Sequence, residues 1–220
     1  IHDVGQGKGI VYFVMGLIEG ESLAARIRRR GRVPAEETRR IMRETADALS
    51  AAHALSIIHR DIKPDNILLE GTRGRVMVTD FGIAKAMSST SSATLTSAGM
   101  AIGTPSYMSP EQARGKDTDA RTDVWSLGVV MFEMLTRTCP FEGDGPMDIV
   151  SSILKDPTPA LRSAAPDLPR QLERIIDKTL RKDRDQRYQH IKDLHIDLDD
   201  LREELKFEEK QGKTVEMTRP

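Results

Sequence analysis

Several features that mark specialised classes of protein are scarce in these 220 residues. The single cysteine, Cys139, excludes a disulfide within the chain and is typical of a reducing compartment. Aromatic residues make up only 4% of the chain, and the formal net charge is −1, which argues against a nucleic-acid partner. The longest apolar run, 127–135, contains Glu133 and is far shorter than the roughly 18 residues of a membrane span. With no signal-peptide pattern at Ile1, we expect a cytoplasmic domain without membrane contact.

Length and apolar patterning predict a mainly helical core with a few strands. At this length the chain can bury one substantial core, or two small ones. Residues 1–4 and the β-branched run 10–14 predict two strands joined by a glycine-rich turn at 5–9. From residue 19 the pattern becomes helical, and Pro34 followed by two acids is typical of a first helical turn.

The downstream half continues this mixture of strand and helix. Two short apolar runs, 67–69 and 76–78, lie on either side of a glycine-containing turn and predict a hairpin. We predict three or more helices here, because apolar residues recur at helical spacing over 124–135, 172–180 and 191–205. The charged, aperiodic segment after them is typical of a tail or linker.

Residues 88–97 contain eight Ser or Thr in ten positions and have no helical period. A disordered linker is the simplest interpretation of such a composition. A regulated loop is the alternative. It is favoured because Asp-Phe-Gly at 80–82 precedes the segment and Ser-Pro-Glu at 109–111 follows it.

The most specific chemistry lies in the run His-Arg-Asp-Ile-Lys-Pro-Asp-Asn at 59–66, with Asp80 fourteen residues after its last position. Phosphoryl transfer from a metal-bound nucleotide needs an acid to orient the acceptor, a cation near the phosphate and oxygen ligands for magnesium. An isolated Asp-x-Lys is usually a surface pair, and an isolated Asp-Phe-Gly is usually a turn. Together, in this order and at this separation, they predict a phosphoryl-transfer centre.

This pair of motifs resembles the protein kinase family. The resemblance implies an α+β, protein kinase-like fold with a mainly helical C-lobe and remnant N-lobe strands. Residues 1–18 are then an N-lobe remnant of two strands and a hinge, 19–205 the C-lobe, and 206–220 a charged tail or linker.

The resemblance also assigns roles in catalysis, with ATP and Mg²⁺ as cofactors. Asp61 is the expected catalytic base, because a carboxylate at the acceptor hydroxyl can orient it and take its proton. Lys63 is expected to balance charge on the transferring group. Asn66 is expected to act in catalysis and, with Asp80, to supply oxygen ligands to Mg²⁺.

Part of a nucleotide site is expected near the N-terminus. By resemblance, Met15 faces the adenine, Gly16 and Ile18 offer backbone hydrogen bonds, and Leu68 forms the floor of the site. Gly16 departs from the family, whose members usually carry Glu there, but a backbone contact needs no side chain.

The acceptor and the regulation can also be inferred from the resemblance. Lys63 and Thr104 match residues typical of Ser/Thr kinases, so a protein Ser or Thr is the expected acceptor. Arg60 is expected to be buried near negative groups and to receive a phosphate from the following loop. Thr94 and Thr96 are the expected phosphorylation sites, which would allow autophosphorylation.

Several further residues match structural positions of the family. Glu111 and Arg187 match a pair that ties the segment after Asp-Phe-Gly to the last helices. Asp123 matches an acid that braces the backbone of the catalytic loop. The remaining structural matches are His59, Phe81 and Gly82.

Two nucleotide-binding motifs of the family have no match in these residues. Neither Gly-x-Gly-x-x-Gly nor a Val-Ala-Ile-Lys-type strand with its partner glutamate is present. In one interpretation, the chain is part of an active kinase of the bacterial, eukaryotic-like type. The sequence of residues 107–113 resembles this type, and its members are often membrane-anchored. The isolated chain would then be inactive and prone to self-association through an apolar face. The alternative is a non-catalytic binding or scaffold module.

Overall fold

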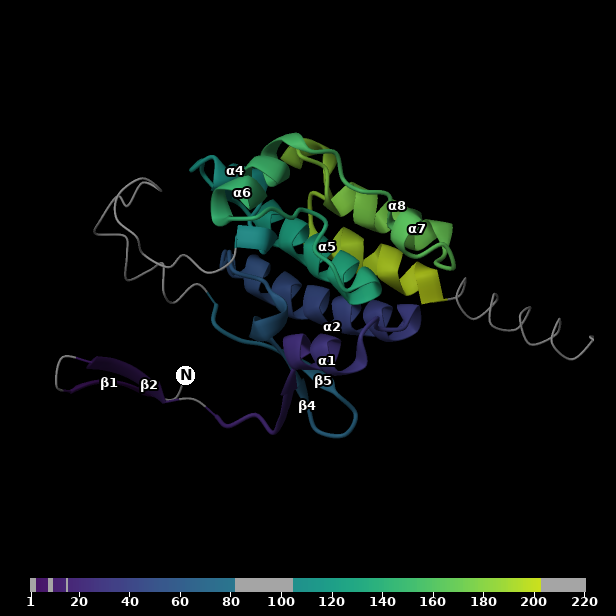
Figure 1. Cartoon of the computed structure of the whole chain (residues 1–220). Helices are drawn as coiled ribbons and strands as arrows, with labels where there is room; N and C mark the ends of the chain where they lie inside the picture. The colour runs from purple at the N-terminus through teal and green to yellow at the C-terminus, as the bar shows by residue number, and fades with distance from the viewer. Residues whose placement is uncertain (1–2, 8–9, 15, 82–104, 203–220) are drawn as a thin grey trace, which may run out of the picture.

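The computed structural model describes residues 3–7, 10–14, 16–81 and 105–202. Helices form most of this structure, and two small antiparallel sheets accompany them (Figure 1). The α+β, mainly helical architecture predicted from the sequence is confirmed. Within the described part of the chain, no helix is both long enough and apolar enough to cross a membrane.

The N-terminal hairpin consists of β1 (Asp3–Gly7) and β2 (Ile10–Val14), paired in register from Asp3 with Val14 to Gly7 with Ile10. The prediction that the first strand ends before Gly5 was wrong. Gly5 pairs with Tyr12, and a β-carbon at Gly5 would collide with the Tyr12 ring. Glycine is therefore used here inside a strand, because it leaves room for a cross-strand aromatic ring.

The second sheet has the order β3-β4-β5, with β3 (Gly20–Ser22), β4 (Ile67–Glu70) and β5 (Arg75–Val78) all antiparallel. The hairpin predicted at 67–69 and 76–78 is confirmed, whereas β3 is an addition. Gly20 passes so close to the Leu69 carbonyl that a β-carbon would collide with that backbone. Ser22 ends β3 and caps the next helix, because its hydroxyl accepts a bond from the Ala25 N–H at 3.2 Å.

The helices surround one apolar core. The longer ones are α1 (Leu23–Arg30), α2 (Ala35–Ala54), α5 (Arg121–Thr136), α6 (Pro146–Lys155), α8 (Arg170–Thr179) and a helix over 191–202. The short ones are α4 (Pro110–Ala113), α7 (Leu161–Ala164) and the 3-10 turns η1 (Pro64–Asn66), η2 (Pro105–Tyr107) and η3 (Arg184–Gln186).

The centre of the core is α5, which packs between α2 and α8 (Figure 1). Nearly all residues of α5 are buried, as expected for a helix whose sequence has no polar face. Trp125 stacks on Phe141 with ring centroids 5.5 Å apart. A β-carbon at Gly128 would collide with the side chain of Thr179, so α5 and α8 approach closely at this position. The start of this helix contacts the loop 59–66.

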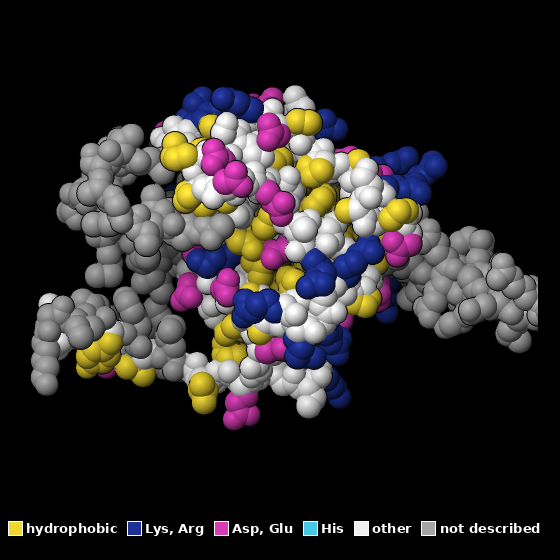
Figure 2. Space-filling view, viewed as in Figure 1, with side chains coloured by type: hydrophobic (Ala, Val, Ile, Leu, Met, Phe, Trp, Pro, Cys, Tyr) yellow, Lys and Arg dark blue, Asp and Glu magenta, His cyan; other side chains and the backbone are white. Residues whose placement is uncertain are grey.

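On the face drawn in Figure 2, basic, acidic and apolar side chains are interspersed over most of the surface. Lys and Arg side chains gather at the end of the molecule where Figure 1 places α4.

Candidate active site

The loop 59–66 is held by hydrogen bonds to Asp123, the third residue of α5. Asp123 is completely buried. Its carboxylate accepts the backbone N–H of His59 at 2.9 Å and of Arg60 at 2.8 Å, and it contacts the His53 ring at 2.8 Å. Arg60 has a φ of 66°, a region that costs free energy for a residue with a side chain. The paired N–H groups hold the loop in this conformation.

The ring of His59 connects this loop to the segment that carries Asp80. Its Nε2 donates to the Thr79 carbonyl at 2.7 Å, and its Nδ1 accepts the Asp61 N–H at 3.3 Å. These two contacts together define a neutral ring with the proton on Nε2. The ring also packs on Phe81 at 4.7 Å between centroids. The two motifs are therefore joined through a buried imidazole.

Three of the expected reactive side chains meet at one point. Lys63 Nζ donates to Asp61 Oδ2 at 2.8 Å. Asn66 Nδ2 donates to the Asp61 carbonyl at 2.8 Å and to Asp61 Oδ2 at 3.2 Å. The Asp61 side chain remains 60% exposed. Its carboxylate is thus oriented by two neighbours and still open to an incoming group.

Oxygen donors suited to a magnesium ion lie on both motifs. The Asn66 amide nitrogen is used by Asp61, so its oxygen is available to a cation. Thr79 N donates to the Asn66 carbonyl at 3.0 Å, which places the next residue, Asp80, beside this loop. Asp80 is exposed and has a φ of 61°. Among the described residues no group of three or more His, Cys, Asp or Glu could hold a metal ion.

The expected nucleotide contacts are only partly described. Gly16 is exposed and Ile18 is half-buried, in a stretch without secondary structure that leads into β3. Leu68, on β4, pairs with Ser22 of β3 and is half-buried. The remaining predicted site residues lie outside the described residues: Met15, Gly82, Thr94, Thr96 and Thr104.

The expectation that Arg60 is buried was wrong, because its side chain is exposed. The contacts at this residue come from its backbone instead: the N–H bonds to Asp123, and the carbonyl accepts from Gln112 Nε2 at 2.8 Å. The left-handed backbone turns both peptide groups inward and leaves the side chain outside. Gln112, which contacts the loop, and His53, which contacts Asp123, were missed because no local pattern connects them to it.

Glu111 and Arg187 form a bidentate ion pair with both N···O distances at 2.8 Å. Thr122 donates to the same carboxylate at 2.9 Å. Burial by itself would raise the pKa of Glu111, but the bonds from Arg187 outweigh it and lower the pKa below its ordinary value. The pair connects α4 to the segment just after η3.

Known proteins include similar sequences and a similar solved structure. A model of the protein kinase domain matches residues 1–195. The chain is 39% identical over 198 residues to serine/threonine-protein kinase PrkC of Bacillus subtilis (strain 168), covering 90% of this chain and 30% of PrkC. It is 42% identical over 193 residues to serine/threonine-protein kinase PknA of Mycobacterium tuberculosis (strain H37Rv), covering 86% of this chain and 43% of PknA.

The fold is similar to the crystal structure of the Mycobacterium tuberculosis PknI kinase domain, at a TM-score of 0.71 and 23% identity. That match covers 90% of this chain and 69% of the PknI chain. The chain spans less than half the length of the two curated relatives above.

Proposed function

The chain belongs to the protein kinase family, and from that premise we propose that the protein transfers the γ-phosphoryl group of ATP to Ser or Thr of a protein. The observation that carries this proposal is the meeting of Asp61, Lys63 and Asn66 at one exposed carboxylate. In phosphoryl transfer the protein contributes mainly positioning and electrostatic stabilisation. The site offers both.

In the proposed reaction the acceptor hydroxyl binds at the Asp61 carboxylate. As its oxygen forms a bond to the γ-phosphorus, the hydroxyl proton passes to Asp61, and the bond from the γ-phosphorus to the β–γ bridging oxygen breaks. ADP leaves with the electron pair of that bond. Lys63, 2.8 Å from Asp61, stabilises the negative charge on the transferring group. Asn66 keeps the carboxylate oriented toward the acceptor.

Asn66 and Asp80 are the proposed magnesium ligands. When bound, the metal with its nucleotide supplies the phosphoryl group and neutralises charge on the phosphates. The amide oxygen of Asn66 supports this assignment, because its nitrogen is already used by Asp61. Among the residues that the structure describes, we propose Gly16, Ile18 and Leu68 as contacts to the adenine.

The acceptor class, regulation and domain division also remain proposals. Lys63 and Thr104 support Ser/Thr specificity, and the exposed side chain of Arg60 is accessible to a phosphate on Thr94 or Thr96. We place the N-lobe remnant at 1–18 and the C-lobe at 19–205, in a protein that works in the cytoplasm, where ATP is supplied.

The test is transfer of labelled phosphate from ATP and Mg²⁺ to a Ser/Thr-containing acceptor protein, using the full translated polypeptide that contains these residues. We expect transfer by the wild-type protein and a loss of at least 100-fold in Asp61→Asn and Asp80→Asn. Wild-type turnover no faster than that of Asp61→Asn would overturn the proposal and support the non-catalytic scaffold. The 220-residue chain assayed alone should show little turnover, because its sequence contains no phosphate-pairing lysine strand.

A further inference from the structure

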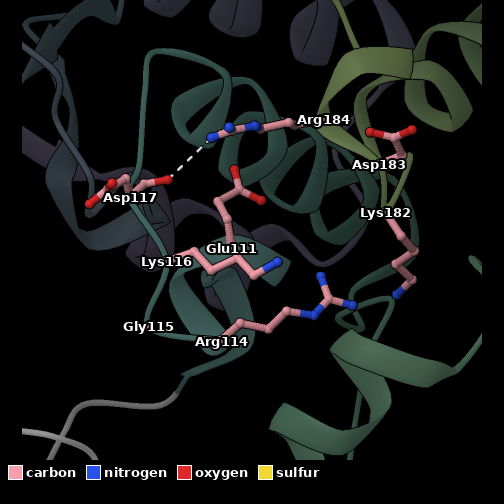
Figure 3. Close-up of a pocket in the computed structure, with 8 residues that line it drawn as sticks. All are labelled: Glu111, Arg114, Gly115, Lys116, Asp117, Lys182, Asp183 and Arg184. Atoms are coloured by element: carbon pink, nitrogen blue, oxygen red, sulfur yellow. Dashed lines mark hydrogen bonds between the residues drawn. The ribbon is translucent and has the colours of Figure 1, made fainter.

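A cavity of about 530 Å³ lies between the turn after α4 and the turn that contains η3. Its lining consists of charged side chains and one glycine, without an apolar residue. Such a lining favours a polar or charged ligand. The basic lining residues are Arg114, Lys116, Lys182 and Arg184 (Figure 3).

The acidic side chains of the lining do not neutralise these cations. Glu111 is engaged by Arg187 and Thr122. Asp183 caps η3 by accepting the Asp185 N–H at 3.0 Å. In Figure 3 the carboxylates of Asp183 and Asp117 point away from the heads of the basic side chains.

Within the described residues, three of the four cations form no ion pair with a carboxylate. Arg184 is the exception, at 3.3 Å from Asp119. Neither Arg114 nor Lys116 makes a side-chain hydrogen bond or ion pair with any residue that the structure describes, and both are exposed. Lys182 donates to the Ile153 carbonyl at 2.6 Å, and its ammonium lies 3.5 Å from the centroid of the Phe141 ring. Both partners are neutral, so neither cancels its charge.

Two of these unpaired cations approach one another from opposite walls. In Figure 3 the Arg114 guanidinium and the Lys182 ammonium extend into the same space, and Lys116 extends toward it from the α4 side. Burial, assisted by the positive charges of Arg114 and Arg187, lowers the pKa of Lys182 to about 8 against the opposing effect of Asp156. The cavity therefore holds like charges close together, and a bound anion would relieve this repulsion.

We propose that this cavity binds the phosphate of a phosphorylated Ser or Thr in a protein partner. Arginine offers a planar fork that matches phosphate oxygens in pairs, and lysine adds a point charge. A cavity of this volume admits the phosphorylated side chain with adjacent backbone. The choice of a phosphoprotein rests on the proposed function, since a Ser/Thr kinase generates such groups. The cationic site itself does not depend on catalysis.

The position of the cavity suits a docking site that works beside the active site. The helix α4 contributes Glu111 to the cavity, and its Gln112 donates to the carbonyl of Arg60 in the catalytic loop. A phosphorylated protein held at this cavity would therefore lie on the helix that contacts the loop containing Asp61.

Binding can be measured by fluorescence anisotropy with a labelled peptide Gly-Ala-Ala-Ser-Ala-Ala-Gly, phosphorylated at its serine, whose sequence is not taken from this chain. The protein is treated with phosphatase first, and the unphosphorylated peptide serves as the comparison. We expect the phosphopeptide to bind at least tenfold more tightly, and its affinity to fall as salt is added. Equal affinity for the two peptides would overturn the proposal.

The site is identified with the double variant Arg114→Ala/Lys116→Ala. Because both side chains are exposed and unpaired, this variant should unfold at the wild-type temperature while losing at least tenfold in phosphopeptide affinity. The matched control is Arg28→Ala/Arg73→Ala, which removes two exposed charges elsewhere. If the control loses as much affinity as the double variant, the attraction is non-specific and the proposal is wrong.

Two further arms distinguish this cavity from the catalytic loop and from a site for free anions. Arg60→Ala and Asp61→Asn should bind the phosphopeptide as wild type does. A loss confined to Arg60→Ala would place the phosphate at the catalytic loop and overturn the proposal.

Inorganic phosphate should compete only at concentrations at least tenfold above those of the phosphopeptide. Equal potency would identify a free-anion site instead of a docking site. Because no arm requires turnover, failure here would leave the proposed kinase activity untouched.

Discussion

Asp61 and Asp123 are aspartates of the same neighbourhood with opposite surroundings. The Asp61 side chain is 60% exposed and bonds to Lys63 and Asn66. Asp123 is fully buried and accepts two backbone N–H groups of the loop that carries Asp61. An exposed ion pair contributes about 0–1 kcal/mol, whereas losing a partner of buried donors costs about 1–3 kcal/mol for each group left unpaired. The exposed carboxylate of Asp61 is thus positioned by a loop that a second, buried acid holds in place.

The largest expected effect separates activity from stability at Asp61. Asp61→Asn in the full polypeptide should lower the rate of phosphoryl transfer by about 10²–10⁴-fold, because the base is lost. The urea midpoint should remain unchanged, because the side chain is exposed. Asp144→Asn, at another exposed aspartate, should leave both quantities at wild-type values. A stability loss at Asp61 as large as that at Asp123 would remove the contrast between the two acids.

The next effect tests whether buried carboxylates in general serve stability. Glu111→Gln should lower the free energy of unfolding by about 3–5 kcal/mol, because Arg187 is left as a buried charge without its partner. Urea unfolding followed by circular dichroism measures this. Glu142→Gln, at an exposed acid, should stay within about 0.5 kcal/mol.

A double variant sharpens this result. Glu111→Leu/Arg187→Met should be more stable than Glu111→Gln, because neither charge remains buried. A double variant less stable than the single one would mean that the pair contributes more than mutual neutralisation.

A smaller loss of stability is expected at Asp123. Asp123→Asn retains one acceptor oxygen but directs an amide N–H₂ toward a backbone or imidazole group, so we expect a loss of about 1–3 kcal/mol. Phosphoryl transfer should fall as well, since Asp61 follows directly after the N–H groups that Asp123 holds. Faster hydrogen exchange at His59 and Arg60 would show the loosened loop. Wild-type exchange there would contradict the bracing role.

The smallest effect extends the comparison to a cation. Burial holds the pKa of Lys182 at about 8, below its ordinary 10.5, while Arg114 and Arg187 lower it and Asp156 raises it. Between these values the unfolded chain binds more protons than the folded one, so stability should rise as pH increases from 8 to 10.5. Lys182→Met should lack this rise. The measurement is the wild-type minus Lys182→Met difference in free energy of unfolding across that range, and a flat difference would contradict the shift.

Local patterns predicted α2, α5, α8, the helix over 191–202 and the β4–β5 hairpin, because their periodicities lie within a few neighbouring residues. The helix α6 was not predicted. The strand β3 was not predicted, since Gly-Glu-Ser has no strand pattern and forms only by pairing with β4 more than forty residues later. Arg60 was expected to be buried. Its side chain is exposed because its backbone is left-handed, a conformation held by the bond from its N–H to Asp123 of α5.

The sequence alone determined the family and the expected roles of Asp61, Lys63, Asn66 and Asp80, because phosphoryl transfer needs those side chains in a short, ordered run. Only the tertiary structure decided how exposed each acid is and which groups contact it. The backbone N–H groups of His59 and Arg60 are held by Asp123 from α5, and the cationic cavity lies between turns about seventy residues apart. Such arrangements depend on packing between distant segments, so they leave no local pattern.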